Sequence, residues 1–408
     1  MRLTLLVVCV IALVTAGAAS AQPQRFQQDR FAIGFWVGPP IDDQLEAHYA
    51  AIAEANFTIA LSGFGANTEE AIARQFALCE KHDLRLLAIP PTPDLANLPD
   101  HPTCWGYLLR DEPNAADFPA LRTMVDKVRA ERPGRLAYIN LFPNYASEKQ
   151  LGTPTYEEHV RRFVDEVDVD VLSMDHYPIF KPEKDGRDGY CETLSVMREH
   201  SLRKGLPFWN FFNTMPYGPH TDPTESQLRW QIYTSLAYGA KGVLYFCYWT
   251  PQGGEFPKGG AIITAEGRPT RHYEQAKRIN REIKNLGPTL MQLTSTAVIR
   301  MTEENDPLSV LSGSPIADIQ RADVDPPNDY LIGVFSHKDG RRAVLLNNYR
   351  FAFTAWPTVV FDAPVDLVRE VDPNTGQEVP VVDDSPLMEG TQLSLDAGAG
   401  RLFLLPAR

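Results

Sequence analysis

Cysteine is scarce in this sequence, which contains five among its 408 residues. Cys9 lies in an N-terminal apolar segment, and the others are Cys79, Cys104, Cys191 and Cys247. No pair has the CxxC spacing of a zinc site, and no HxH or HExxH pattern offers histidine ligands. The sequence therefore predicts no metal site and no cofactor. We expect most of these cysteines to be buried free thiols, with one disulfide as an open alternative.

Positive charge is also under-represented. Lysine and arginine number 39 against 52 aspartates and glutamates, which gives a formal net charge of -13. Nucleic-acid binding needs a basic footprint, and an anionic membrane surface would repel such a chain. The negative charge is most simply interpreted as an aid to solubility. Hydrophobic residues make up 44% of the chain, which is enough for a globular core.

Long apolar runs are confined to the N-terminus. Arg2 precedes an apolar stretch over residues 3–14, and Ala19-Ser20-Ala21 fits the small-x-small cleavage rule. We interpret residues 1–21 as a signal peptide, with a mature chain that begins near Gln22 and is secreted or periplasmic. A membrane anchor is the alternative, but the run is shorter than the ~20 residues of a spanning helix.

Eight short apolar runs follow, and they are near-continuous rather than alternating. Strands that are buried on both faces have this character. The runs are Phe31–Trp36, Phe57–Leu61, Leu84–Ile89, Cys104–Leu109, Leu136–Asn140, Val169–Met174, Pro207–Phe212 and Gly242–Cys247.

Amphipathic segments separate nearly all of these runs. They cover residues 41–55, 68–82, 118–132, 156–167, 193–204 and 224–238, and a last one over 272–286 is expected to stop at Gly287-Pro288. The connection Thr92–Thr103 is proline-rich, so its crossover helix should be degenerate. Strand-helix alternation of this length predicts right-handed parallel crossovers, and eight of them close a barrel. We therefore predict an α/β fold with a (β/α)8 TIM barrel over residues 22–295.

The pattern changes after the last of these helices. Tyr330–Phe335 and Arg342–Leu346 flank the turn His337-Lys-Asp-Gly340, which is a hairpin signal, and further short strands follow. This predicts a small C-terminal antiparallel β-sandwich domain over residues 296–408. We do not expect it to supply catalytic groups, because every candidate lies before residue 260.

Polar and aromatic side chains follow the predicted strands, where the active site of such a barrel lies. Carboxylates and amides can bind sugar hydroxyls, and aromatic rings can stack on sugar faces, so the predicted partner is a carbohydrate. Glycosidic cleavage needs two carboxyl groups, one of them protonated. We predict Glu112 and Asp175 as catalytic residues. The predicted substrate-binding residues are Trp36, Asp111, Asn140, His176, Tyr177, Trp209, Asn210, Tyr248 and Trp249.

The motif Asp111-Glu112-Pro113 resembles the Asn-Glu-Pro motif of clan A glycoside hydrolases. In that clan the glutamate is the acid/base, and the preceding polar residue binds a sugar hydroxyl. The resemblance implies these roles for Glu112 and Asp111. Tyr177 and Trp249 resemble the clan's sixth-strand tyrosine and eighth-strand tryptophan. Over residues 30–408 the pattern is similar to bacterial proteins labelled β-galactosidase- or agarase-like.

One departure from the clan concerns its nucleophilic glutamate at the end of the seventh strand. Residues 206–215 contain no carboxylate here. Asp175 is our candidate for the second carboxylate, and Glu255 is the alternative. An exported glycoside hydrolase is our first hypothesis, and a glycan-binding barrel without catalysis is the second. The sugar, the linkage and the oligomeric state stay open.

Other interpretations concern single residues. Glu112 could be a structural carboxylate that is salt-bridged to Arg110, since residues two apart on a strand share a face. Trp209 could belong to the barrel core rather than to a sugar platform. Asp175 could merely position His176, and metal binding by that histidine is disfavoured because it lacks partner ligands.

Overall fold

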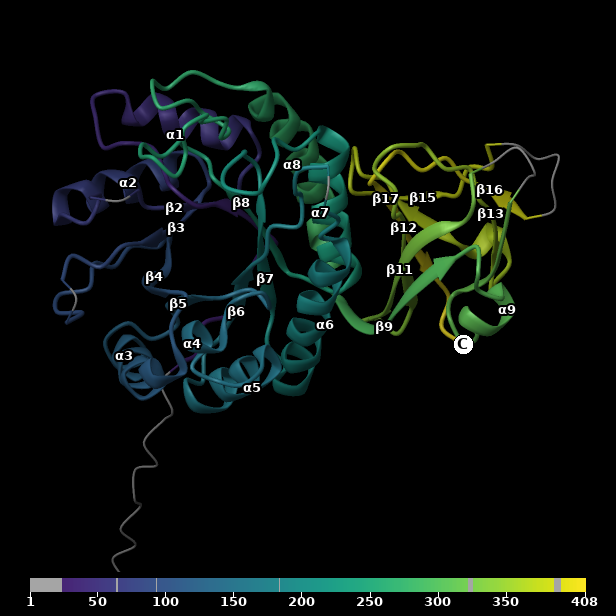
Figure 1. The fold of residues 1–408 in the computed structure, drawn as a ribbon, viewed down its shortest axis with the longest axis horizontal. Coiled ribbons are helices and arrows are strands. Elements are labelled where there is room, and N and C mark those ends of the chain that lie inside the picture. Colours follow the sequence, from purple (N-terminus) through teal and green to yellow (C-terminus); the bar gives the residue numbers. More distant parts are fainter. Residues whose placement is uncertain (1–23, 64, 93, 183, 322–325, 385–389) are drawn as a thin grey trace, which may run out of the picture.

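The computed structural model describes residues 24–408 apart from 64, 93, 183, 322–325 and 385–389. The predicted signal peptide lies outside these residues. Figure 1 shows two parts, a barrel of strands and helices and a β domain beside it. Within the described residues, none of the helices has the length and apolar character that crossing a bilayer requires. The four cysteines that follow the N-terminal segment are free thiols.

Eight parallel strands form the barrel, in the order β1-β8-β7-β6-β5-β4-β3-β2. The gap between β1 and β2 is bridged where the Thr58 N–H donates to Ile33 O at 2.9 Å and Thr58 Oγ1 accepts from the Ile33 N–H at 2.8 Å. The predicted barrel fold is confirmed, and each apolar run overlaps one strand. The strands are β1 Ala32–Phe35, β2 Ile59–Leu61, β3 Arg85–Ala88, β4 Cys104–Asp111, β5 Leu136–Leu141, β6 Leu172–Asp175, β7 Phe208–Asn213 and β8 Gly242–Phe246.

Helices connect these strands and surround them. They are α1 Leu45–Glu54, α2 Glu69–Lys81, α3 Phe118–Glu131, α4 Glu148–Leu151, α5 Tyr156–Glu166, α6 Arg187–Lys204, α7 Glu225–Ala237 and α8 Arg271–Leu290, with a 3-10 turn η1 at Ala115–Asp117. The described part of the β3–β4 connection contains no helix, as its proline content indicated.

The expected end of α8 at Gly287-Pro288 was wrong, because this helix includes Pro288 and continues to Leu290. Proline removes one backbone donor and crowds the carbonyl four residues earlier. Here it stands in the final turn, which still closes through a hydrogen bond from the Met291 N–H to Gly287 O at 2.9 Å.

Aromatic side chains fill the barrel interior. The Trp209 ring lies 5.9 Å from Trp105 and 5.6 Å from Tyr138 between centroids, and its Nε1 donates to Gln28 at 2.9 Å. Such inward layers make the barrel a packed core below its active end. The sequence-predicted site must therefore occupy the rim above these rings.

The C-terminal domain consists of two antiparallel sheets, which confirms the predicted sandwich. One sheet has the order β15-β14-β17-β12-β11-β9, and the other β10-β13-β16. Its elements are β9 Leu293–Thr302, α9 Pro307–Val310, β10 Ile316–Gln320, β11 Asp329–His337, β12 Arg342–Asn348, β13 Thr358–Phe361, η2 Val365–Leu367, β14 Arg369–Val371, β15 Glu378–Pro380, β16 Thr391–Gln392 and β17 Gly400–Leu405.

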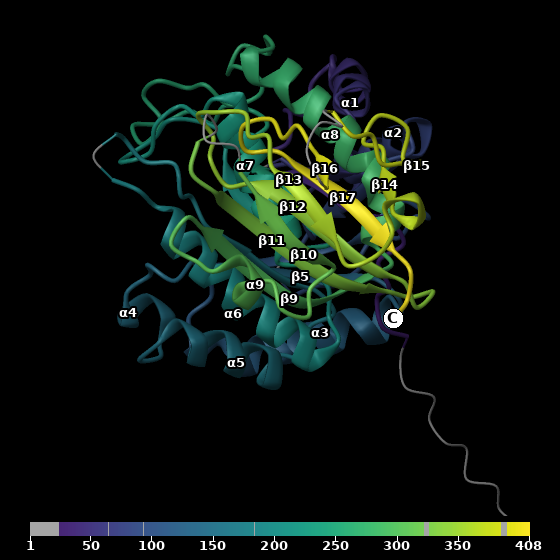
Figure 2. The same ribbon diagram turned by 90° about the vertical axis from the view of Figure 1, so that its right-hand side faces the viewer.

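The six-stranded sheet packs against the barrel helices α6 and α7, and Figure 2 shows it in front of the barrel. Asn347 in β12 donates to Tyr233 O in α7 at 2.7 Å. Arg198 in α6 donates to Ser295 Oγ in β9 at 2.8 Å. The β domain thus contacts the outer helices on one side of the barrel.

Gly106 offers a direct test of the β4–β5 pairing. A Cβ at this position would lie 2.0 Å from the backbone oxygen of Leu136. Because a backbone atom cannot move aside as a flexible side chain does, Gly106→Ala should lower the free energy of unfolding by about 2–3 kcal/mol or more. Urea denaturation measures this change.

The matched control is Gly254→Ala, since nothing lies within 4 Å of a Cβ there. It should stay within about 0.5 kcal/mol of the wild type. A Gly106→Ala protein as stable as the control would contradict the register of these two strands.

Candidate active site

The carboxyl ends of β4, β5 and β6 bring together three of the predicted site residues. Asp111 is the last residue of β4, Asn140 lies next to it in β5, and Asp175 ends β6. The parallel pairing places Asp111 directly beside Asn140, and Asn140 beside Ser173 of β6. The strand register therefore places Asp111 beside this amide on one side, and on the other side Asp175 follows two residues after Ser173 at the end of β6.

The side chain of Asn140 links these two acids. Its Nδ2 donates to Asp111 Oδ1 at 3.2 Å and to Asp175 Oδ1 at 3.1 Å. Its Oδ1 accepts from Ser173 Oγ at 3.0 Å, and Tyr138 OH lies 2.9 Å from that Oγ. The carboxylates accept hydrogen bonds, so they fix which end of the amide carries the donors, and the Ser173 hydroxyl donates to the other end. Both N–H groups are thus directed at carboxylates.

Glu112 leaves the strand in an unusual backbone conformation. Its φ is 47°, in the left-handed region that non-glycine residues seldom adopt. The Glu112 N–H still donates to Asn140 O at 2.8 Å, so the turn is attached to β5. Backbone strain of this kind is concentrated at functional sites.

Burial and the adjacent charge of Asp111 raise the pKa of Glu112 from its ordinary 4.5 to about 7. The side chain is only partly buried, so it remains within reach of solvent and ligand. The alternative salt bridge to Arg110 is not what the structure shows, since Arg110 pairs with Asp117 at 3.4 Å. Glu112 therefore holds a proton near neutral pH without a cationic partner among the described residues.

Asp175 is the most enclosed of the three acids, with 6% of its surface exposed. Burial, followed by the charges of Glu112 and Asp111, raises its pKa well above the ordinary value, while hydrogen bonds from Asn140 and Tyr177 act in the opposite direction. Burial also raises the pKa of Asp111. Like charges this close cannot all ionise together, so the three carboxyl groups share their protons.

Aromatic rings surround this acidic floor. Trp36 contacts Phe211 edge-on at 5.7 Å, and Tyr177 lies 5.1 Å from Phe246 and 5.8 Å from Tyr217. Of these residues, only Trp36 and Tyr177 were predicted from the sequence as site residues. Tyr217 follows β7 in a Pro-Tyr-Gly-Pro loop and Phe246 ends β8, so both could have been found from their places at strand ends.

Tyr145 and His176 form a further part of the rim. The Tyr145 side chain is 53% exposed, although it is large and apolar, and its ring lies 5.0 Å from His176. His176 is buried, and its Nδ1 lies 2.9 Å from Thr193 Oγ1. Burial lowers the pKa of His176 to about 3, so it is neutral. His176 thus supports the Tyr145 ring from behind.

Four predicted substrate-binding residues point elsewhere. Trp209 lies in the packed interior, and Asn210 faces the helices, where its Nδ2 donates to Tyr190 OH at 2.6 Å and to Ser235 Oγ at 2.9 Å. Tyr248 stacks on Phe35 at 4.6 Å. The fourth residue, Trp249, packs edge-on against His48 of α1 at 4.9 Å. The structure does not bring these four together with the three acids.

The end of β7 carries an amide where the clan has a carboxylate. Asn213 is fully buried, and its Oδ1 accepts from the Ile179 N–H at 3.3 Å. Glu255, the alternative second carboxylate, is exposed in the loop after β8, where its charge reaches Tyr217. Asp111, Glu112 and Asp175 are therefore the carboxyl groups that stand at the ends of β4 and β6, whereas Glu255 lies in a loop.

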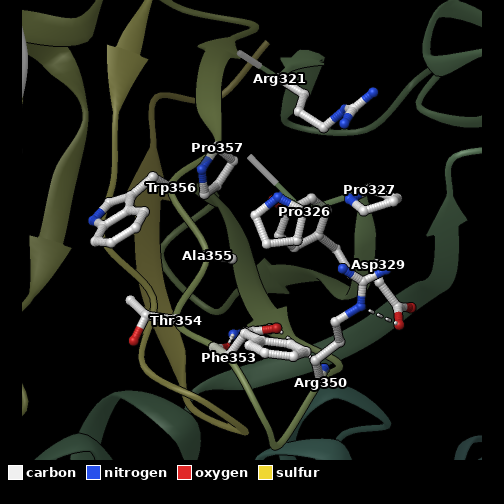
Figure 3. Close-up of a pocket in the computed structure, with 12 residues that line it drawn as sticks. Arg321, Pro326, Pro327, Asp329, Arg350, Phe353, Thr354, Ala355, Trp356 and Pro357 are labelled. Atoms are coloured by element: carbon white, nitrogen blue, oxygen red, sulfur yellow. Dashed lines mark hydrogen bonds and ion pairs between the residues drawn. The ribbon is translucent and has the colours of Figure 1, made fainter. Parts of the chain in front are cut away.

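Two other features lie away from this site. Among the described residues, Glu157, Glu199 and His200 are close enough to share a metal ion, but they belong to the outer helices α5 and α6. A small pocket on the C-terminal domain lies between Phe353, Trp356 and the ion pair of Arg350 with Asp329 at 3.2 Å (Figure 3). None of the predicted site residues lines it.

The raised pKa of Glu112 has a consequence for stability. Between pH 4.5 and about 7 the folded protein keeps a proton that the unfolded chain has released, so stability falls as the pH rises through this range. Glu112→Gln removes this effect. Its stability relative to the wild type should increase from about pH 5 to about pH 8 by on the order of 1–2 kcal/mol, measured by urea denaturation. A difference that does not change with pH would contradict the assignment.

Comparison with known proteins adds sequence and fold relationships. Residues 140–286 match the Glyco_hydro_42 family, described as β-galactosidase. This segment includes Asn140, Asp175 and β7 but not Glu112. A search among curated proteins gives no significant sequence match.

Several solved β-galactosidases share the fold. The enzyme from Bacillus circulans sp. alkalophilus has a TM-score of 0.59 at 10% identity, over 92% of this chain and 99% of that chain. A catalytic mutant of a GH42 β-galactosidase from G. stearothermophilus has 0.59 at 9%, over 94% and 100%. The chain spans 60% of the length of the Marinomonas ef1 β-galactosidase, with a TM-score of 0.45 over 62% of this chain at 10% identity. Residues 140–286 are thus similar in sequence to this β-galactosidase family, and the chain as a whole has the fold of these solved enzymes, a TIM barrel followed by a C-terminal β-sandwich.

Proposed function

We propose that the protein is an exported glycoside hydrolase that cleaves O-glycosidic bonds of an oligo- or polysaccharide. The observation that carries this proposal is the group of three acids, Asp111, Glu112 and Asp175, at the carboxyl ends of β4 and β6, where burial and the charge of Asp111 raise the pKa of Glu112 to about 7. A general acid works best when its pKa lies near the working pH. The aromatic rim around it is suited to the apolar faces of sugar rings.

Glu112 performs both proton transfers in this mechanism. It donates its proton to the glycosidic oxygen as the bond to the anomeric carbon breaks, and its carboxylate then accepts a proton from the attacking water. Burial keeps the pKa of Glu112 high, and the negative charge of Asp111 raises it further. Asp175 is the second carboxyl group of the site, and its own burial favours the protonated form.

Asn140 acts as a positioning residue in this proposal. Its Nδ2 already donates to Asp111 and Asp175, so the amide orients the acids rather than a sugar hydroxyl. Tyr177, which also hydrogen-bonds Asp175, belongs to the pocket wall. Trp36, Tyr145 and Tyr217 offer the remaining aromatic surface for the substrate.

A glycan-binding barrel without catalysis is the second candidate, and Asn213 at the end of β7 favours it. The two candidates differ in what Glu112 does. A binding protein would hold oligosaccharides equally well with a neutral residue at this position, and the wild type would release no product. A hydrolase would retain binding but lose turnover.

Glu112→Gln should therefore reduce turnover by several orders of magnitude, roughly 10²–10⁴-fold, because it removes the proton donor while it conserves shape. Product release from a panel of plant and algal glycans measures kcat, and circular dichroism checks folding. The exposed Glu304→Gln in the C-terminal domain is the matched control and should keep wild-type activity. Activity of Glu112→Gln within tenfold of the wild type would overturn the assignment.

We also propose export, supported by the charged start, apolar run and small-residue cleavage pattern of residues 1–21. Expression of the full chain in a bacterial host should yield a protein whose intact mass and N-terminal sequence begin near Gln22. The control changes Ala19 and Ala21 to bulky residues, which should block processing. A wild-type chain that keeps its first 21 residues in the cytoplasm would contradict export.

A further inference from the structure

The site lacks a carboxylate in the position from which clan A enzymes attack the sugar. The stretch from residue 206 to residue 221 contains no aspartate or glutamate, and β7 ends in Asn213. An amide of this kind cannot form the covalent glycosyl intermediate that a retaining mechanism needs. A retaining enzyme with this site must therefore take its nucleophile from another group near Glu112 or from the substrate.

The two aspartates near Glu112 are poorly placed for this role. Asp175 is almost fully enclosed, and both Asn140 and Tyr177 hydrogen-bond it. Asp111 reaches solvent, although the protein atoms around it raise its pKa, but it directly precedes Glu112 in the chain and its charge acts on that carboxyl group. A nucleophile has to face the acid across the scissile bond. Asp111 instead stands beside the acid.

Asp111 has the features of a group that orients a substrate N–H. Its Oδ1 is held by Asn140 at 3.2 Å, and no hydrogen bond to Oδ2 occurs within the described part of the chain. A carboxylate with one oxygen held in place and the other oxygen free can accept a strong, charge-assisted hydrogen bond. Sugar hydroxyls would suit it, but only a substrate amide would also bring a nucleophilic oxygen.

We propose that the substrate supplies its own nucleophile, and that the enzyme acts on β-glycosides of 2-acetamido-2-deoxyhexoses, with Asp111 orienting the acetamido group. This inference rests on the proposed glycoside hydrolase function. It names the substrate class for the same site and gives the adjacent acids Asp111 and Glu112 separate roles.

The reaction balances in two steps. In the first, the acetamido carbonyl oxygen bonds to the anomeric carbon while the bond to the leaving oxygen breaks, Glu112 gives that oxygen its proton, and Asp111 accepts a hydrogen bond from the acetamido N–H. In the second, water bonds to the anomeric carbon, its proton passes to Glu112, and the carbonyl oxygen leaves to restore the amide. The net result is hydrolysis with retained configuration.

The direction of attack determines the anomeric configuration of the substrate in this scheme. The carbonyl oxygen attacks from the face opposite the leaving group, so the acetamido group and the leaving group must be trans. In sugars with the gluco or galacto configuration this requirement selects the β-glycoside. The partly exposed rings of Tyr217 and Phe246, whose centroids lie 5.4 Å apart, offer apolar surface to the acetamido methyl group.

The test compares paired nitrophenyl substrates with the full-length protein. The N-acetyl-β-glucosaminide and N-acetyl-β-galactosaminide should be cleaved with kcat/KM at least about 100-fold above the β-glucoside and β-galactoside, since only the former carry the nucleophile. Replacing the acetyl hydrogens by fluorine withdraws electrons from the carbonyl oxygen. The rate should fall progressively from acetyl to trifluoroacetyl, which no protein nucleophile would produce.

Asp111→Asn gives a second readout. It should lower kcat on the preferred substrate by roughly 10²-fold, because the neutral amide oxygen accepts the acetamido N–H more weakly than the carboxylate does. It should also move the basic limb of the pH profile to lower pH, because Asp111 no longer raises the pKa of Glu112. The exposed Asp43→Asn is the matched control and should change neither.

Faster cleavage of the β-galactoside, or rates that do not respond to fluorine, would overturn this inference while the glycosidase function stands. Asp175→Asn and Glu255→Gln would then identify a protein nucleophile by which variant loses activity. A folded protein that cleaves neither set, nor any glycan of the panel, would overturn both proposals.

Discussion

The site depends on the hydrogen bonds that Asn140 makes with two carboxyl groups. One amide nitrogen donates to Asp111 on β4 and to Asp175 on β6, while the amide oxygen is held from below by Ser173. Because parallel strands align their carboxyl ends, three neighbouring strands contribute one residue each to this arrangement. The amide neutralises neither acid. It fixes their positions and leaves their mutual repulsion, which together with burial keeps protons on this group near neutral pH.

Much of the fold could be predicted because barrel strands are apolar on both faces. The same property prevented a prediction of side-chain direction, since a continuous run has no alternation to read. In β7 the structure directs Trp209 and Phe211 inward and Asn210 toward the helices. Tyr248 follows β8 yet packs among Phe35 and Phe57 outside the barrel. A position at a strand end was therefore insufficient to identify a site residue.

Other parts were missed for different physical reasons. Neither β9 nor β10 was predicted from the sequence. In β9, residues that face the barrel alternate with exposed threonines. Strand β10 is short and lies in a separate sheet. The motif Asp111-Glu112-Pro113 was found because two adjacent acids after an apolar strand are unusual. The role of Asn140 as a link between acids depends on strand register, which a single sequence does not contain.

The central claim is that Glu112 carries a proton at the pH where the enzyme works. The most direct measurement is a carbon-13 NMR titration of the side-chain carboxyl groups, with Glu112→Gln to assign the signal. The account predicts that Glu112 remains protonated through about pH 6 and titrates near pH 7. A Glu112 signal that titrates at the ordinary value of 4.5 would contradict the account.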